Sequence, residues 1–250
     1  MDIVSYKESA FVSKKTWIIF TVIVIGLLTA LVISSRSANP DTDFSNVDTN
    51  SVLAASAASG TIADQVFGNK DSKVVLIEYG DFQCPACASA HPGLKTLAEQ
   101  YKGQLAFVYR NFPLSANHPN ARASSAVAEA AGLQGKYWEM HDYLYENQSA
   151  WSDLQGNTRT DTFTRYAEIL GLDTAKFTTD LASESISQKI SFDQALGKKT
   201  GVNSTPTFYL NGVEVESGII KDLQSGSGAQ LRALIDEQLK KAGIALPTTE

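Results

Sequence analysis

Two cysteines, three positions apart, are the residues of this chain whose types and spacing most directly suggest chemistry. Cys84 and Cys87 are the only cysteines among its 250 residues. A Cys-x-x-Cys pair serves either as half of a zinc site or as a dithiol that cycles with a disulfide. A purely structural disulfide is a third reading, but it would close too short a loop to stabilise the fold much.

The further ligands of a structural zinc site cannot be recognised in the sequence. Structural zinc usually takes four Cys or His ligands. The chain has no second Cys-x-x-Cys, and its histidines, His91, His118 and His141, are widely spread without a His-x₃₋₅-His pair. We therefore expect no metal and a structural role for the histidines. The only redox group that we expect is the disulfide between Cys84 and Cys87, without a separate cofactor.

The cysteines fall where a strand is expected to pass into a helix. Residues 73–79 form an apolar run rich in β-branched residues, which is typical of a strand buried on both faces. A helical stretch from Pro85 to about Tyr101 follows, and a second apolar run covers residues 105–111. This order predicts a βαβ unit with the cysteines at the first strand-to-helix junction.

A helix N-terminus would make the two thiols unequal. Cys84 would face unpaired backbone N–H groups and the positive end of the helix dipole, both of which favour a thiolate. Its pKa should then fall within a range of about 3.5–7.5. We therefore predict that Cys84 is the nucleophile and that Cys87, one turn further along, is the resolving thiol.

Two more positions could take part in the chemistry. Glu78 lies within the apolar run before the cysteines, where it is either a strand-edge residue that reaches solvent or a buried acid that exchanges a proton with Cys87. Thr205-Pro206 precedes an expected strand, where proline is unusual. It forms either an ordinary trans turn or a cis bond that leaves the backbone of Thr205 free to pair with a substrate peptide.

The rest of the chain after residue 60 predicts helices followed by a hairpin. Residues 119–199 have amphipathic, alanine-rich patterns, with Thr160 and Asp173 as candidate N-caps. Asn211-Gly212 between two short apolar runs predicts a β-hairpin, and a last helix is expected over about 229–242. We therefore predict an α/β fold, a thioredoxin-type sheet interrupted by an inserted helical block at about 119–199.

The N-terminal region differs in composition. The run 17–33 carries no charge and is close to the length that crosses a bilayer as a helix. We expect a retained membrane anchor, with a cleaved signal peptide as the alternative. Lysines before the run predict that residues 1–16 are cytoplasmic. Residues 34–60 are rich in small polar residues and predict a flexible linker to an extracytoplasmic domain over 61–250.

Charge argues against binding to nucleic acid. The chain has 21 basic and 27 acidic residues, for a formal net charge of −6. The basic residues are scattered, whereas nucleic-acid surfaces cluster Lys and Arg. A general nucleic-acid binder is therefore excluded.

Several motifs together resemble the membrane-anchored DsbA-like thiol-disulfide oxidoreductases over about residues 61–245. They are Glu78-Tyr-Gly-Asp-Phe-Gln-Cys-Pro-Ala-Cys87, Arg110-Asn-Phe-Pro-Leu114, His118-Pro119, Gly135-Lys-Tyr-Trp-Glu-Met-His-Asp142 and Thr205-Pro-Thr-Phe208.

The resemblance implies a thioredoxin fold with a helical insertion, an acid at Glu78 and a cis-proline loop at Thr205-Pro206. We expect substrate to contact Thr205, Pro206, Pro85 and Ala86. The best-known members carry a histidine at the position of Ala86, so we expect an oxidant of intermediate strength here. The family also implies a quinone-linked membrane protein as the partner that restores the disulfide.

The sequence thus predicts an extracytoplasmic, membrane-anchored enzyme that passes its disulfide to reduced exported proteins. One alternative is the same chemistry run as a reductase or isomerase. Another is a non-catalytic, membrane-tethered chaperone that holds peptides, although the intact Cys-x-x-Cys pair argues against it.

Overall fold

The computed structural model describes residues 14–37 and 47–248, which belong to two separate units, residues 1–43 and 44–250. In the first unit, α1 covers Lys14–Ser37 and contains the predicted anchor. None of the helices in these described ranges has the length and apolar character that a membrane crossing requires. Most of the predicted cytoplasmic segment 1–16, and residues 38–46 of the predicted linker, lie outside the described residues.

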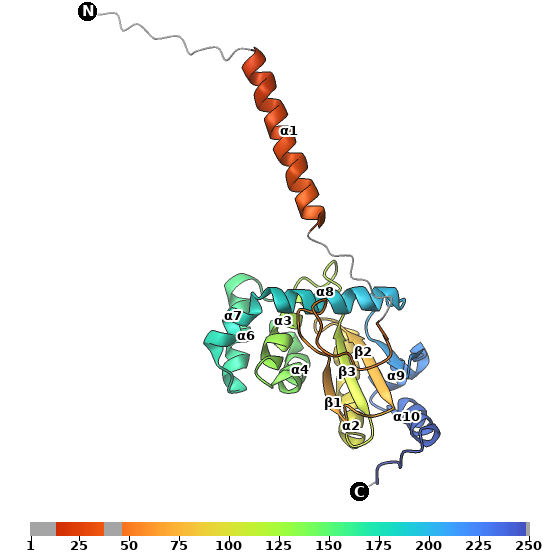
Figure 1. Cartoon of the computed structure of the whole chain (residues 1–250). Helices are drawn as coiled ribbons and strands as arrows, with labels where there is room; N and C mark the ends of the chain where they lie inside the picture. Colours follow the sequence, from red (N-terminus) through yellow and green to blue (C-terminus); the bar gives the residue numbers. More distant parts are fainter. Residues whose placement is uncertain (1–13, 38–46, 249–250) are drawn as a thin grey trace, which may run out of the picture. The chain divides into compact units, whose positions relative to one another are not determined.

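The second unit is built on a five-stranded mixed sheet (Figure 1). Its strand order is β1-β3-β2-β4-β5, with β2 and β3 parallel and the other neighbours antiparallel. The strands are β1 (Gln65–Gly68), β2 (Val75–Gly80), β3 (Ala106–Asn111), β4 (Thr207–Leu210) and β5 (Val213–Glu214). Every residue of the three central strands is buried, which explains their near-continuous apolar sequence.

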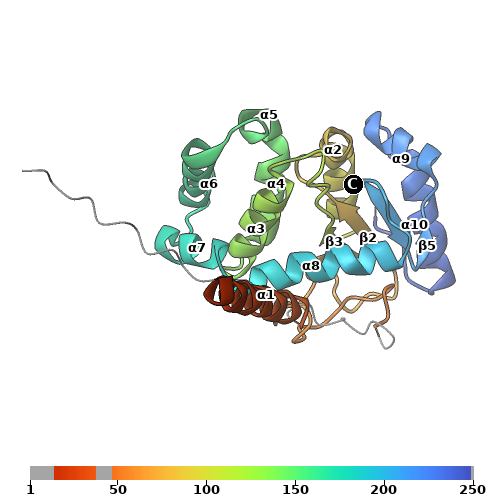
Figure 2. The same cartoon turned by 90° about the horizontal axis from the view of Figure 1, so that it is seen from above.

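Helices cover both faces of the sheet. On one face, α2 (Pro85–Gln100), α9 (Ser217–Gln224) and α10 (Ala229–Lys241) share an apolar cluster with β2, β3 and β4. On the other face, the C-terminal part of α8 (Glu184–Lys199) lies against the sheet, with Gly197 beside Tyr79 and Phe112. The view from above shows α2 and α8 on opposite sides of the strands (Figure 2).

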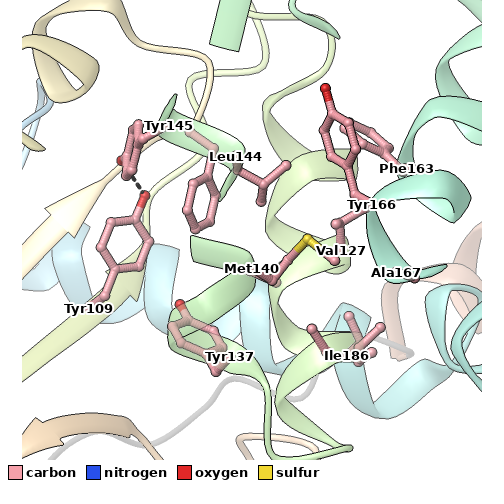
Figure 3. Close-up of a cluster of buried hydrophobic side chains, with 14 of the residues drawn as sticks. Tyr109, Val127, Tyr137, Met140, Leu144, Tyr145, Phe163, Tyr166, Ala167 and Ile186 are labelled. Atoms are coloured by element: carbon pink, nitrogen blue, oxygen red, sulfur yellow. Dashed lines mark hydrogen bonds between the residues drawn. The ribbon is translucent and has the colours of Figure 1, made fainter. Parts of the chain in front are cut away.

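The remaining helices form a block between β3 and β4. They are α3 (Ala121–Gly132), α4 (Tyr137–Glu146), α5 (Gln148–Trp151), α6 (Gly156–Ile169) and α7 (Thr174–Leu181). Together with α8 they enclose a separate apolar core (Figure 3). The prediction of a thioredoxin-type sheet interrupted by helices at about 119–199 is therefore confirmed, as is the N-cap at Asp173, whose side chain accepts from the backbone N–H of Lys176.

Other local predictions need correction. Thr160 is not an N-cap, because α6 already begins at Gly156 and the hydroxyl of Thr160 bonds back to the Gly156 carbonyl oxygen. The short edge strand β1 and the helix α9 were not predicted. β1 has only four residues and α9 eight, so neither carries enough periodicity to be recognised.

A buried ion network joins the sheet to the helical block. Asp64 accepts hydrogen bonds from Arg110 on β3 at 2.8 Å and from Lys189 on α8 at 2.9 Å. Lys189 also pairs with Asp193 at 2.7 Å, and all four side chains are at most 1% exposed. Such a network is costly to break, because removing one partner leaves an uncompensated buried charge.

The same network holds the segment before the domain. Arg110 donates to the carbonyl oxygens of Thr49 and Ser51 at 2.6 and 2.7 Å, and Asp64 accepts from the backbone N–H of Leu53. Three residues within the predicted flexible linker 34–60, namely Thr49, Ser51 and Leu53, are therefore held to the domain by hydrogen bonds. The segment has few large apolar residues, but two of its backbone carbonyls accept hydrogen bonds from a buried arginine.

Candidate active site

The two cysteines lie where β2 leads into α2. Cys84 is the N-cap of α2 with an extended backbone, and Pro85 occupies the first turn, where its missing N–H is not needed. Cys87 lies one turn further in and is 1% exposed, whereas Cys84 is 7% exposed. Both are free thiols. The junction therefore presents the dithiol form of the pair at a helix N-terminus.

The environment separates the pKa values of the two thiols. A hydrogen bond from the Cys87 side chain, assisted by Thr205 and by the backbone N–H groups of Cys87 and Ala86, outweighs partial burial and lowers the pKa of Cys84 to about 5. Burial, together with that same hydrogen bond and the charge of Glu78, raises the pKa of Cys87 well above its usual value. Cys84 is thus the thiolate at neutral pH and Cys87 the thiol.

Glu78 is a buried acid rather than a strand-edge residue. It lies on β2, is 2% exposed and is electrostatically coupled to both cysteines. Burial, with a smaller effect of the Cys84 charge, raises the pKa of Glu78 to about 8. A carboxyl with this pKa is protonated at neutral pH. Because its pKa lies close to neutral pH, it can also give up its proton.

Thr205 and Pro206 reach the nucleophile from the other end of the chain. Their peptide bond is cis, as the second of the two sequence readings proposed. In its protonated form Cys84 donates from Sγ to the carbonyl oxygen of Thr205, at 3.4 Å. Pro206 leads directly into β4, which pairs with β2 so that Phe208 lies opposite Glu78. The sheet register therefore brings this loop, the cysteines and Glu78 together.

Asp81 fixes the loop that precedes the cysteines. Its carboxylate accepts from the backbone N–H groups of Gln83 and Leu114, at 2.8 and 2.9 Å, and lies 2.7 Å from Nδ1 of His118. The backbone N–H of Cys84 in turn bonds to the carbonyl oxygen of Asp81. The structural role predicted for His118 is thus to position the active-site loop.

Two glutamines tie the same loop to neighbouring helices. Gln148 of α5 donates to the carbonyl oxygens of Phe82 and Cys84, at 2.7 and 3.1 Å. Gln224 of α9 donates to the carbonyl oxygen of Ala86 at 3.2 Å. Sequence reasoning missed both, since nothing in the local pattern distinguishes them from surface glutamines.

The buried side of Cys87 faces a pair of tyrosines. The hydroxyls of Tyr109 on β3 and Tyr145 on α4 are 2.8 Å apart and fully buried (Figure 3). The pKa of each is raised well above its usual value, chiefly by burial, with the charges of Glu78 and Cys87 adding to it. The ring of Tyr109 lies directly against Gly80, where a Cβ would come within 2.6 Å of its hydroxyl oxygen. A glycine is required there for the ring to approach the strand.

A polar cleft of about 450 Å³ opens beside the exposed Pro85. Gln83, His118, Gln148 and residues 152–155 are among the residues that line it. The cleft therefore adjoins the accessible end of the Cys-x-x-Cys pair.

A profile of the thioredoxin family, described simply as thioredoxin, matches residues 60–237. The chain therefore belongs to the thioredoxin family. Its inserted helices and the unequal thiols of its Cys-x-x-Cys pair agree with the resemblance to the DsbA-like thiol-disulfide oxidoreductases that the sequence indicated.

Solved structures agree with this fold. One is a thioredoxin-like oxidoreductase from Silicibacter pomeroyi, at 25% identity and a TM-score of 0.58 over 78% of this chain and 98% of that one. BdbD from Bacillus subtilis has 18% identity and a TM-score of 0.59 over 76% of this chain and 98% of its own, so it supports the fold alone.

The curated proteins that match part of this chain are named as antiporters and not as oxidoreductases. A protein from Mycolicibacterium vanbaalenii named Na(+)/H(+) antiporter NhaA 1 is 33% identical over 65% of this chain and 26% of its own length. A protein of the same name from Salinispora arenicola is 38% identical over 60% of this chain and 22% of its own length. The chain spans only about a quarter of the length of these curated relatives.

Proposed function

We propose that this protein is a thiol-disulfide oxidoreductase that works in the oxidising direction, as a donor of disulfides to reduced exported proteins. The observation that carries the proposal is the separation of the two thiols, with the pKa of Cys84 lowered to about 5 and that of Cys87 raised. Stabilising the Cys84 thiolate stabilises the reduced form, and a couple whose reduced form is stabilised is a stronger oxidant.

The exchange begins with the oxidised pair. A substrate thiolate attacks Sγ of Cys84, a substrate–Cys84 disulfide forms, and the Cys84–Cys87 bond breaks with its electron pair on Cys87. Glu78, protonated at neutral pH, gives its proton to the departing Cys87 sulfur. A second substrate thiolate then attacks the substrate sulfur and expels Cys84 as a thiolate. The substrate loses two electrons and the cysteine pair gains them.

Substrate contacts in this proposal surround Cys84. The backbone of Thr205 lies within hydrogen-bond distance of the Cys84 sulfur, so it could pair with an extended peptide bonded there. Pro206, Pro85 and the half-buried Ala86 complete the surface that such a peptide would touch. The polar cleft beside Pro85 offers room for the chain on one side.

The extracytoplasmic location and the membrane anchor are further parts of the proposal. Disulfides persist outside the cytosol, which suits an oxidant there. The run 17–33 is uncharged, and its side chains from Trp17 to Phe20 are exposed on consecutive positions and therefore on every face of α1. A helix with apolar side chains on every face is typical of a segment that is buried in a protein core or spans a membrane. A quinone-linked membrane protein would reoxidise the pair.

The activity is tested with the full chain. Oxidised protein should restore the activity of a reduced, disulfide-dependent substrate, and Cys84→Ala should abolish this. Rapid reduction of insulin without substrate oxidation would instead favour a reductase. For the location, protease added to intact cells should release the domain, and a mature N-terminus near Ser37 would identify a cleaved signal in place of an anchor.

A further inference from the structure

A second cluster of reactive side chains lies behind the active site, between α2 and α4. Nε2 of His91 is 3.6 Å from Oδ1 of Asp142, and Nδ1 of His141 is 3.0 Å from the same oxygen. One candidate ligand atom from each residue lies within 4.8 Å of the other two. His91 and His141 are far apart in the sequence, which is why their spacing predicted no metal site.

Two ring nitrogens of this cluster, Nε2 of His91 and Nε2 of His141, are buried without a hydrogen-bond partner among the described residues. His91 is 4% exposed. A buried polar atom without a partner costs free energy.

Two of the three separations between the ligand atoms fit tetrahedral coordination. Zinc binds imidazole nitrogen and carboxylate oxygen at about 2.0–2.2 Å, which places neighbouring tetrahedral ligand atoms about 3.3 Å apart. The two measured separations, 3.0 and 3.6 Å, lie on either side of this value. The rings are also held in place: His91 stacks on Tyr145, and His141 meets Tyr109 edge-to-face at 4.9 Å.

The site has a small opening and one competing cation. His91, His141 and Asp142 share a cavity of about 30 Å³, which is large enough to hold one water molecule as a fourth ligand. Lys95 lies 2.8 Å from Oδ2 of Asp142 and also pairs with Glu146. Its ammonium group pairs with the other oxygen of the same carboxylate, so its positive charge would repel a metal ion bound there.

We propose that His91, His141 and Asp142 form a binding site for a divalent transition-metal ion, with zinc as the best match, completed by one water molecule. Two imidazoles and one carboxylate are a ligand set that zinc uses in proteins with an open fourth position. The ion would join α2, which carries the cysteines, to α4 of the helical block. The proposal is independent of the direction of thiol exchange.

The test measures zinc binding to the untagged full chain in detergent micelles. The protein is kept oxidised so that Cys84 and Cys87 offer no thiolate. Titration with zinc chloride against a chromogenic chelator should give one ion per chain. Asp142→Asn and His91→Gln should each weaken binding at least tenfold, and circular dichroism should show that they remain folded. Glu99→Gln, which lines the same cavity without being a ligand, should leave the affinity within twofold.

Lys95→Gln supplies a test in the opposite direction. Removing the competing ammonium should tighten zinc binding, whereas an ion held elsewhere on the surface would not respond. The proposal is overturned if the oxidised wild-type chain binds no zinc. It is equally overturned if Asp142→Asn folds and retains the wild-type affinity for zinc. If Asp142→Asn does not fold, an unchanged zinc affinity of Lys95→Gln overturns the proposal instead.

Discussion

The sulfur of Cys84 lies 3.4 Å from the carbonyl oxygen of Thr205, although 121 positions separate the two residues in the chain. The pairing of β4 with β2 creates this contact, because it brings the loop before β4 alongside the N-terminus of α2. Two paired strands of one sheet therefore position the nucleophile and the backbone of Thr205 next to each other. A chain bonded to Cys84 would lie within reach of that backbone.

The first prediction concerns the reactivity of the two thiols. With a pKa of about 5, Cys84 in the reduced protein should be alkylated at a rate that reaches its plateau by about pH 6 to 7. Cys87, buried and with a raised pKa, should react at least about tenfold more slowly at pH 7. Mass spectrometry of iodoacetamide-treated protein across pH measures both rates. Equal labelling with the profile of an ordinary thiol would contradict the assignment.

The second prediction concerns Glu78 and pH. Its folded-state pKa of about 8 exceeds the ordinary value of 4.5, so the folded state binds the proton more tightly. Stability linked to this group is fully present below pH 4.5 and falls through the window up to pH 8, by roughly 1 kcal/mol per unit. Glu78→Gln should flatten that fall, as seen in urea unfolding at several pH values, and should slow exchange by about 10²-fold.

The exposed Glu214 on β5 provides the matched control for Glu78. Glu214→Gln should change neither the pH profile nor the exchange rate. If Glu78→Gln behaved in the same way, the role of Glu78 as the proton donor to Cys87 would be wrong.

The third prediction concerns the glycine beneath Tyr109. Gly80→Ala places a Cβ within 2.6 Å of the Tyr109 hydroxyl oxygen, so the ring must move away from the strand. Overpacking of this kind costs about 1–3 kcal/mol. Gly103→Ala meets no atom within 4 Å and should change the stability by less than about 0.5 kcal/mol. Thermal unfolding of both variants measures the difference, and equal effects would show that the ring contact is unimportant.

The fourth prediction concerns Arg110 and the segment that it holds. Arg110→Met removes one of the two cationic partners of Asp64 and the donors to Thr49 and Ser51, so it should cost about 3–5 kcal/mol. It should also expose residues 47–53 to limited proteolysis. Lys70→Met breaks an exposed pair with Asp71 and should cost at most about 1 kcal/mol. An intact 47–53 segment in Arg110→Met would refute the proposed anchoring.

Local patterns predicted the parts of the site that depend on neighbouring residues. Pro85 after a buried strand indicated the helix start, and Asn211-Gly212 indicated the hairpin, where both residues adopt positive φ. The meeting of His91 with His141, and of Arg110 with the carbonyls of Thr49 and Ser51, depends on tertiary packing between distant elements. Sequence periodicity reports which face of an element is buried, and it does not report which buried polar groups meet.

The most direct test of the account is the reduction potential of the Cys84–Cys87 couple, measured by equilibration with glutathione mixtures. The lowered pKa of Cys84 should place the potential between those of thioredoxin and DsbA, at about −230 to −150 mV. Ala86→His should raise it by at least about 30 mV, which is roughly tenfold in the equilibrium constant. A wild-type potential at or below that of thioredoxin, about −270 mV, would contradict the oxidising role and identify a reductase.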